Sequence, residues 1–417
     1  MEIGVLKEIK EGEKRVALRP DQASVLKSYG HRVYVENGAG VGSGFPNTEY
    51  EKNGSIVVSK CEVLDKARLL LKVKAPLPEE YRDYNENHTL FTYLHFDENI
   101  APQQIEELIS RGFLGIAYEW VGENKHYPLL QPMSRLTGYL FAQKALYLCA
   151  WNKGVFCSGN ESFLPSAYAM IIGLGNIGLS TLKYFLDNKL KLTVLDNADL
   201  QSANTKANVR FKTTNIDYIR AFNIDYIQMD INNPVITKDA ITKRMQALDI
   251  IICSAVRRQN LSKDKVEYLI DREMVSQMTP GSVICDATAN DKDLIETCIS
   301  SASLHYTYEV NGVIHYNCDH IPALVARTAT QLLTQESFHY VLQMANNGIV
   351  ETILSNRFLC NGVSCFKGQL THKDTATKKG LPWQPIGELL HSDSVRQRYA
   401  LEAVAFGSVV MSTSERD

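Results

Sequence analysis

Short apolar runs alternate with amphipathic stretches along the first third of the chain. The apolar runs at residues 3–6, 32–36, 69–74, 90–94 and 113–117 are typical of strands, and residues 20–30 and 103–111 have the spacing of helices. Strands that alternate with helices form βαβ units, so this pattern predicts an α/β fold with a parallel sheet covered by helices on its faces. A longer helical pattern at residues 132–147 leads into a second region of the same kind.

That second region opens with the most informative pattern in the chain. An apolar run at residues 169–172 passes directly into Gly173-Leu174-Gly175-Asn176-Ile177-Gly178. This is the G-x-G-x-x-G pattern of a dinucleotide-binding strand, turn and helix. Gly173 permits the tight turn, Gly175 lets the backbone approach a pyrophosphate, and Gly178 lets the helix pack closely on the strand. The N-terminal amides of that helix would bind the phosphates.

The next predicted strand, residues 190–195, ends on Asp196. An acid about 20 residues after the fingerprint binds the ribose hydroxyls of the adenosine half of NAD. The same carboxylate would repel the 2′-phosphate of NADP, so we expect the cofactor to be NAD. Later strands at residues 250–255 and 282–287 continue the domain, and residues 322–356 have a helical pattern.

Composition narrows the class of protein. The chain has 417 residues, 45% hydrophobic and 22% charged, which is typical of a soluble globular protein with two domains. A net charge of −3 predicts no binding to nucleic acid or to anionic membranes. The charged N-terminus lacks the apolar region of a signal peptide, and no apolar run approaches the length of a membrane span. We therefore expect a cytoplasmic protein that acts on a small molecule.

The nine cysteines include no CxxC pair, and the spacing of Cys360, Cys365 and His372 fits no usual zinc site. Scattered thiols in a reducing cytosol explain them better, so we expect no metal.

Three residues stand where a parallel sheet places ligands, at or after the carboxyl ends of strands. Arg15 follows the first predicted strand, Lys74 ends the run at 69–74, and His95 follows the run at 90–94. Arginine can bind a carboxylate through two hydrogen bonds, and lysine can polarise a carbonyl or imine. Histidine can move a proton near neutral pH. Together they suit a small carboxylate substrate whose α-carbon exchanges a hydride with NAD.

At these residues the chain resembles the family of alanine dehydrogenases and proton-translocating transhydrogenases. The matching segments lie at residues 4–9, 15–18, 38–45, 71–76, 91–95, 132–134, 361–363 and 380–382. The family fold implies two doubly wound α/β domains, with a Rossmann NAD-binding domain (131–326) inserted into a discontinuous substrate domain (1–130 and 327–417). Family members usually form homo-oligomers, so we expect one here.

The resemblance also implies roles for individual residues. Arg15, Lys74 and Tyr93 fall on substrate-binding positions, His95 on the acid/base histidine, Glu119 on a nearby carboxylate, and Met133 on a residue beside the nicotinamide. The implied cofactor-binding residues are Ser134, Gly173, Gly175, Asn176, Ile177, Gly178, Asp196, Val256, Arg257, Ala287, Asn290, His320 and Ile321.

This chain departs from alanine dehydrogenases on the substrate side. Their catalytic aspartate aligns with Asn290, which cannot take a proton. Asp291 is the nearest replacement, although successive side chains of a strand point to opposite faces. Their N-M-P segment is here His320-Ile321-Pro322, and residues 158–162 and 255–260 also differ from the family pattern.

Three functions remain open at this point. The leading one is an NAD-dependent amino-acid dehydrogenase that interconverts an L-amino acid with a 2-oxo acid and ammonia. The second is the opine-forming branch of the family, which reduces the imine between a 2-oxo acid and the amine of an amino acid such as ornithine or lysine; Asp319-His320-Ile321-Pro322 suits that branch. The third is a catalytically inactive NAD sensor, which the presence of Arg15, Lys74 and His95 together argues against. A transhydrogenase is disfavoured because no membrane span is predicted.

Overall fold

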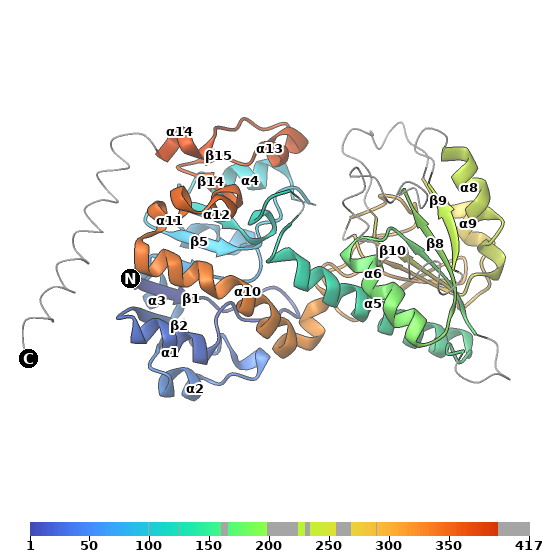
Figure 1. Cartoon of the computed structure of the whole chain (residues 1–417), viewed down its shortest axis with the longest axis horizontal. Helices are drawn as coiled ribbons and strands as arrows, with labels where there is room; N and C mark the ends of the chain where they lie inside the picture. The colour runs from blue at the N-terminus through green and yellow to red at the C-terminus, as the bar shows by residue number, and fades with distance from the viewer. Residues whose placement is uncertain are drawn as a thin grey trace, which may run out of the picture. The chain divides into compact units, whose positions relative to one another are not determined.

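The computed structural model describes residues 1–390 apart from residues 99, 125, 160–165, 198–223, 230–233, 256–267 and 289. The chain forms two compact units, Met1–Met133 with Val325–Asp417, and Ser134–Leu324 (Figure 1). The first unit is therefore discontinuous in sequence. The boundaries expected from the sequence, after residues 130 and 326, lie within a few residues of these. Among the described residues, no helix combines the length and apolar character needed to cross a membrane.

The first unit is built on an eight-stranded sheet in the order β15-β14-β6-β5-β4-β1-β2-β3. Its strands are β1 (Glu2–Val5), β2 (Arg32–Glu36), β3 (Ile56–Val58), β4 (Leu69–Leu71), β5 (Thr89–Thr92), β6 (Leu114–Ala117), β14 (Val363–Phe366) and β15 (Gln369–Leu370). The central strands β4, β5 and β6 are buried along their whole length, as expected for a parallel sheet covered on both faces.

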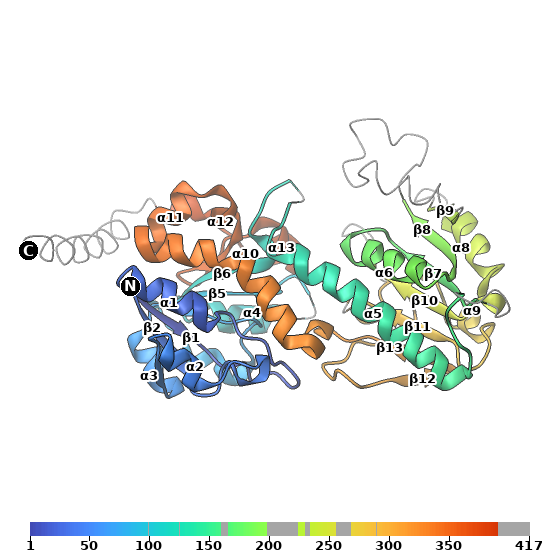
Figure 2. The same ribbon diagram turned by 60° about the horizontal axis from the view of Figure 1, so that its bottom comes forward.

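Helices pack around this sheet. They are α1 (Pro20–Ser28), α2 (Asn47–Lys52), α3 (Lys60–Lys66), α4 (Pro102–Ile109), α10 (Ala326–Asn347), α11 (Ile349–Ser355), α12 (Arg357–Gly362), α13 (Lys373–Lys379) and α14 (Ile386–Leu390). Figure 2 shows α10 beside α1, although they lie far apart in the sequence. The Gln22 side chain on α1 donates a hydrogen bond to the backbone oxygen of Thr334 on α10 at 2.8 Å. The returning chain thereby completes the first unit.

The second unit is built on a seven-stranded sheet in the order β12-β13-β11-β10-β7-β8-β9. Its strands are β7 (Tyr168–Ile172), β8 (Lys191–Asp196), β9 (Asp225–Gln228), β10 (Ile250–Cys253), β11 (Val283–Asp286), β12 (Tyr308–Val310) and β13 (Val313–Tyr316). The six strands other than β12 are parallel. Numbered along the chain, they follow the Rossmann order 3-2-1-4-5-6. The predicted α/β class is confirmed in both units.

Helices α5 (Leu130–Lys153), α6 (Asn176–Asp187), α8 (Pro234–Thr242) and α9 (Arg272–Ser276) belong to this part of the chain. Figures 1 and 2 both show α5 and α6 side by side. A Cβ atom on Gly138 of α5 would lie 2.1 Å from the backbone oxygen of Ile177, so only glycine permits this close approach. The Thr181 hydroxyl also donates to the backbone oxygen of Gly138 at 3.0 Å.

The sequence prediction was wrong about the edges of both sheets. Strand β14 pairs antiparallel with β6 and with β15, and β12 pairs antiparallel with β13. The sequence after residue 358 is polar overall, so its pattern did not predict the short buried strand Val363–Phe366. Strands β4 and β5 also end at Leu71 and Thr92, so Lys74 and His95 lie in the loops beyond them rather than at the strand ends.

Candidate active site and cofactor site

His95 lies in a loop of the first unit where the backbone is strained. Its φ is +50°, a left-handed conformation that costs a residue other than glycine about 1–3 kcal/mol. The Glu119 carboxylate stabilises this loop, because it accepts the backbone N–H of His95 at 2.6 Å and that of Leu94 at 3.2 Å. Glu119 is buried on the short helix Tyr118–Trp120 that follows β6. The segment that follows β6 therefore fixes the backbone of the His95 loop, which follows β5.

The His95 ring itself has two partners. It stacks on the ring of Tyr93, with centroids 5.3 Å apart and an angle of 10° between the planes. Its Nδ1 lies 3.0 Å from Oε1 of Glu98. Burial and Lys74 lower the pKa of His95, but the carboxylates of Glu98 and Glu119 outweigh them and raise it above its usual value. Because Nδ1–H donates to Glu98, Nε2 is the atom of the neutral ring that can accept a proton.

Arg15 is buried and held by an acid that the sequence analysis did not single out. Glu13 accepts hydrogen bonds from Arg15 Nε at 2.8 Å and from Nη2 at 2.6 Å. Burial alone would raise the pKa of Glu13, but the Arg15 guanidinium lowers it to about 2. Two donors of Arg15 are therefore engaged by Glu13. The other edge of the guanidinium, formed by Nη1 and the second N–H of Nη2, keeps the geometry to bind a carboxylate through two hydrogen bonds.

Met133 and Tyr93 complete the surroundings of Arg15. Nη1 of Arg15 lies 3.5 Å from the sulfur of Met133, and both side chains are buried. Tyr93 is close enough to Arg15 for the guanidinium to lower the pKa of its phenol, although burial raises that pKa more strongly. The Tyr93 hydroxyl donates to the backbone oxygen of Leu129 at 2.7 Å, so this hydroxyl is already engaged.

Lys74 lies close enough to His95 and to Glu13 for its charge to act on both. Its ammonium lowers the pKa of His95 and also that of Glu13. The loop that carries it is held by Glu8, whose Oε1 accepts the backbone N–H of Val73 at 2.6 Å and that of Lys74 at 3.3 Å. The structure thus brings Arg15, Lys74, Tyr93, His95 and Met133 together in the first unit.

A buried network behind the Lys74 loop was not predicted either. Lys72 Nζ lies 2.8 Å from Glu8 Oε2 and 3.3 Å from Glu80 Oε2, and all three side chains are almost fully buried. Acids in a charged stretch of sequence resemble solvent-exposed residues, so the sequence around Glu8 and Glu13 did not indicate their burial. Their position directly after the first strand is the feature that could have marked them, because a parallel sheet gathers polar groups there.

The second unit carries the dinucleotide fingerprint on the turn between β7 and α6. Gly173 has φ +89°, and a Cβ on Gly178 would lie 1.9 Å from the backbone oxygen of Gly173. Among the described residues, no atom lies within 4 Å of the Cβ position of Gly175, so the start of α6 at Asn176 and Ile177 is open to these residues on that side. This turn has the shape that a pyrophosphate needs at the N-terminus of a helix. The residues present therefore fit a dinucleotide.

Asp196 is the last residue of β8 and is buried. One of its carboxylate oxygens accepts the backbone N–H of Leu174 at 2.6 Å. The acid is thereby fixed against the fingerprint turn itself, in the place where the ribose of the adenosine half binds in this fold.

The loops after β11 and β13 lie at the carboxyl edge of the same sheet. Asn290 donates from its side chain to the backbone oxygen of Thr288 at 3.0 Å. Asp291 is exposed, and its carboxylate accepts the backbone N–H of Ser300 at 2.6 Å. The Asp291 carboxylate is thus hydrogen-bonded within its own loop. Ala287 is held by a hydrogen bond from its N–H to the backbone oxygen of Cys253 at 2.8 Å.

The remaining predicted cofactor residues are placed as follows. His320 and Ile321 are buried where the chain leaves β13, and Ser134 is partly buried near the start of α5. Val256 and Arg257 lie outside the described residues, as do three of the residues in the 158–162 segment.

A Rossmann strand order with Asp196 held at the fingerprint turn defines the class, an NAD-binding α/β oxidoreductase. Two protein-family models match the chain, and they support this class and identify the family within it. The Alanine dehydrogenase/PNT N-terminal domain matches residues 4–137, and the corresponding C-terminal domain matches residues 149–373. The chain belongs to the alanine dehydrogenase/PNT family.

Individual relatives match over nearly the full length. The alanine dehydrogenase of Bacillus subtilis (strain 168) is 36% identical over 400 residues, which cover 94% of this chain and 99% of that protein. An alanine dehydrogenase of Methanococcus maripaludis is 34% identical over 94% of this chain and 100% of its own. A solved L-alanine dehydrogenase superposes with a TM-score of 0.76 at 28% identity, covering 91% of this chain and 99% of that one. A transhydrogenase from Sinorhizobium meliloti shares the fold, with a TM-score of 0.68 at 21% identity and 90% and 100% coverage.

These findings confirm the expected family, the use of NAD, and the class of NAD-dependent amino-acid dehydrogenase.

Proposed function

We propose that this chain oxidises a small L-amino acid to a 2-oxo acid and ammonia, and catalyses the reverse amination, with His95 as the acid/base group. The observation that supports this proposal is the set of polar groups on the loops after β1, β4 and β5 of the first unit, where Arg15 and Lys74 are buried and His95 is partly buried within the field of the Lys74 charge. Two cations and one imidazole are the groups that a substrate with a carboxylate and a reacting carbonyl or amine requires.

Each residue of the cluster has a distinct role in this proposal. The edge of the Arg15 guanidinium formed by Nη1 and Nη2 binds the substrate carboxylate, because Glu13 occupies the edge formed by Nε and Nη2. Lys74 stabilises the carbonyl or hydroxyl oxygen through its positive charge. His95 accepts a proton at Nε2 from the water that adds to the imine, and returns it to the departing amine. Tyr93 orients the His95 ring by stacking, while Glu119 holds its backbone.

NAD supplies the hydride acceptor at the substrate α-carbon when it is bound. The glycines of the fingerprint and the N-terminal amides of α6 hold its pyrophosphate, and Asp196 binds the ribose of its adenosine half. We assign the remaining cofactor contacts to Ser134, Ala287, Asn290, His320 and Ile321.

The substrate pair is the point on which this chain should differ from its relatives. Asn290 stands where alanine dehydrogenases are expected to carry an aspartate, and Asp291 is bound to the Ser300 amide. The position of that aspartate thus carries an amide, which cannot take a proton, and the neighbouring Asp291 carboxylate is engaged with a backbone amide of its own loop. We therefore expect weak turnover of alanine and better turnover of a different small amino acid or 2-oxo acid.

The test is NADH oxidation with a panel of 2-oxo acids in the presence of ammonia, and kcat/KM for alanine in wild type and Asn290→Asp. A gain for alanine in Asn290→Asp supports the proposal. Wild-type alanine turnover at or above about 10⁴ M⁻¹s⁻¹, the level of an ordinary enzyme on its own substrate, contradicts the altered preference. A complete lack of NADH oxidation with every pair contradicts the proposed activity itself.

A second candidate is the opine-type reaction, in which the amine of ornithine or lysine replaces ammonia. It is favoured by the segment Asp319-His320-Ile321-Pro322, in which the Asp319 carboxylate contacts His320 Nδ1 at 2.6 Å. Replacing ammonia with ornithine or lysine in the same assay separates the two reactions. Faster NADH oxidation with either amino acid than with ammonia identifies the opine-type reaction.

We also infer that the chain works as a cytoplasmic homo-oligomer, following the family pattern. Light scattering on the purified protein measures its mass in solution. A monomer across micromolar concentrations contradicts this assignment.

A further inference from the structure

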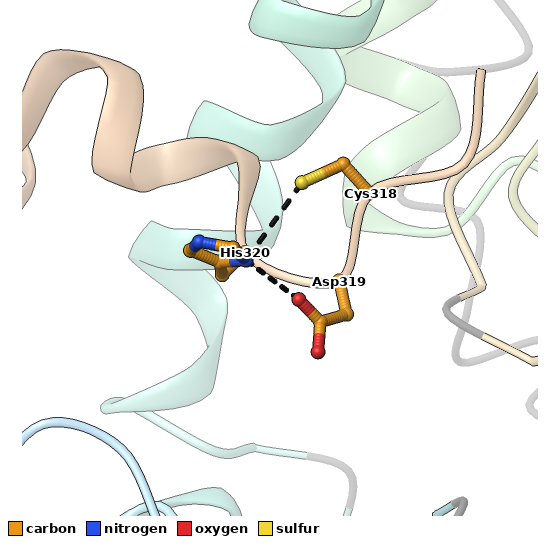
Figure 3. Close-up of side chains that lie close together, drawn as sticks. All are labelled: Cys318, Asp319 and His320. Carbon is orange, nitrogen blue, oxygen red and sulfur yellow. Dashed lines mark hydrogen bonds and ion pairs between the residues drawn. The ribbon is translucent and has the colours of Figure 1, made fainter. Parts of the chain in front are cut away.

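Three possible metal ligands meet at one point in the second unit, on the segment that also carries the predicted cofactor residue His320. The sulfur of Cys318, a carboxylate oxygen of Asp319 and a ring nitrogen of His320 all lie within 4.8 Å of one another. Figure 3 shows the thiol and the carboxylate reaching the same nitrogen of His320 from two sides. No metal was expected from the sequence, because the chain has no CxxC pair and Cys360, Cys365 and His372 fit no usual zinc spacing. Three donors that are adjacent in the chain fall outside such spacings.

The backbone explains how adjacent side chains converge. On a strand, Cys318 and Asp319 would point to opposite faces. Here β13 has ended at Tyr316, Cys318 forms an isolated bridge with Ser301, and the chain turns at Asp319 and His320 before the short helix Ile321–Val325. The turn is closed by a hydrogen bond from Ala323 N–H to the backbone oxygen of His320 at 2.9 Å. The convergence is therefore a property of the fold at this position.

The distances are close to those of a chelate. A tetrahedral zinc ion with ligands at about 2.0–2.3 Å separates a nitrogen from a sulfur by about 3.6 Å and from an oxygen by about 3.3 Å. Nδ1 of His320 lies 3.8 Å from Sγ of Cys318, which already fits, and 2.6 Å from Oδ1 of Asp319, which is a hydrogen bond. To bind an ion, the hydrogen on Nδ1 moves to Nε2 and the carboxylate moves away from Nδ1 by less than an ångström.

The different exposure of the three side chains makes that movement possible. Cys318 and His320 are buried, and they fix two donors, whereas 27% of the Asp319 side chain is exposed. The carboxylate can therefore rotate, and solvent can supply a fourth ligand on that side. The donor set also selects the ion, because a thiolate and an imidazole favour zinc-type transition metals over Mg²⁺ and Ca²⁺.

We propose that Cys318, Asp319 and His320 form a binding site for a divalent zinc-type ion, with water as the fourth ligand. The ion takes the place of the hydrogen between the carboxylate and the imidazole, which moves to Nε2 of the neutral ring, and binding releases the thiol proton.

The experiment uses the full-length chain, freed of metal with a chelator and titrated with Co²⁺. Cobalt bound to a thiolate has a near-ultraviolet charge-transfer band, and the intensity of its visible bands reports the coordination geometry. We expect one Co²⁺ per chain with both features, and displacement by Zn²⁺. Cys318→Ser should remove the charge-transfer band, and Asp319→Asn should weaken binding at least tenfold.

Cys61→Ser is the matched control, because Cys61 is the exposed cysteine among the described residues and would otherwise bind cobalt by chance. It should leave the spectrum and stoichiometry unchanged. The proposal is overturned if wild type shows no charge-transfer band at stoichiometric Co²⁺, if Cys318→Ser keeps it, or if Cys61→Ser removes it. Thermal unfolding of each variant without metal shows whether it is folded, and Asp319→Asn tests the site with the cysteine intact.

Discussion

Replacing Glu13 with glutamine removes the charge that compensates the buried Arg15 guanidinium while preserving the shape of the side chain. The exposed fractions of the two side chains are 0% and 4%, so neither charge has access to water. Removing one partner of a buried ion pair typically costs about 3–5 kcal/mol, because the other charge is left uncompensated. The amide oxygen of glutamine can still accept one hydrogen bond, so we expect the lower end of that range.

The pKa of Glu13 gives a second, linked measure of this loss. Its value of about 2 in the folded protein, against an ordinary value of 4.5, corresponds to about 3 kcal/mol of stability. Since the folded-state pKa is lowered, this stability is fully present above pH 4.5 and is lost as the pH falls toward 2. The difference between wild type and Glu13→Gln should therefore shrink by about 1 kcal/mol between pH 7 and pH 3.5.

Urea unfolding followed by tryptophan fluorescence measures both quantities. Trp120 and Trp383 belong to the first unit, and replacing the exposed Trp151 with phenylalanine removes the signal of the second. Asp21→Asn is the control, because its partner Arg19 forms an exposed ion pair that should contribute less than about 1 kcal/mol. A loss below about 1 kcal/mol in Glu13→Gln, or one that does not change with pH, would refute this reasoning.

Three further predictions concern chemistry and the cofactor. His95→Ala should lower turnover by about 10²–10⁴-fold and leave NADH binding unchanged. The control is His126→Ala, which replaces an exposed histidine of the same unit and should keep its activity. Near-native turnover in His95→Ala would remove His95 from the mechanism. Glu98→Gln removes a charge that raises the pKa of His95, so the alkaline rise of kcat/KM in amino-acid oxidation should move to lower pH. A rise at unchanged or higher pH contradicts the assignment of His95 as the base. Asp196→Ala should weaken NADH binding and narrow the preference over NADPH in fluorescence titrations, and equal wild-type affinity for both cofactors would overturn the role of Asp196.

The sequence predicted strands β7, β8, β10 and β11 and the helix after the fingerprint in the second unit, because their signals are local. The fingerprint glycines and Asp196 act within one strand, turn and helix, so their spacing along the chain determines their geometry. The same holds for the central strands, where continuous apolar runs mark burial on both faces.

The substrate cluster was only partly predictable. Arg15, Lys74 and His95 could be selected by their positions after strands, but this signal did not show which of the nearby acids would hold them. Glu13 and Glu98 stand among many charged residues, and only the fold shows that one is buried against Arg15 and the other reaches His95. The edge strand β14 was missed for a related reason, because its burial depends on pairing with β6, far away in the sequence.

Isotope labelling in the amination direction tests the central claim most directly. The full-length enzyme is incubated with a 2-oxo acid, ¹⁵N-ammonia and NADH carrying deuterium at the transferable position, and the products are analysed by mass spectrometry. We predict an amino acid that carries both ¹⁵N and a deuterium on its α-carbon, formed by wild type and strongly reduced in His95→Ala. An amino acid without the deuterium, or no labelled amino acid from any 2-oxo acid tested, would contradict the assignment of this chain as an NAD-dependent amino-acid dehydrogenase.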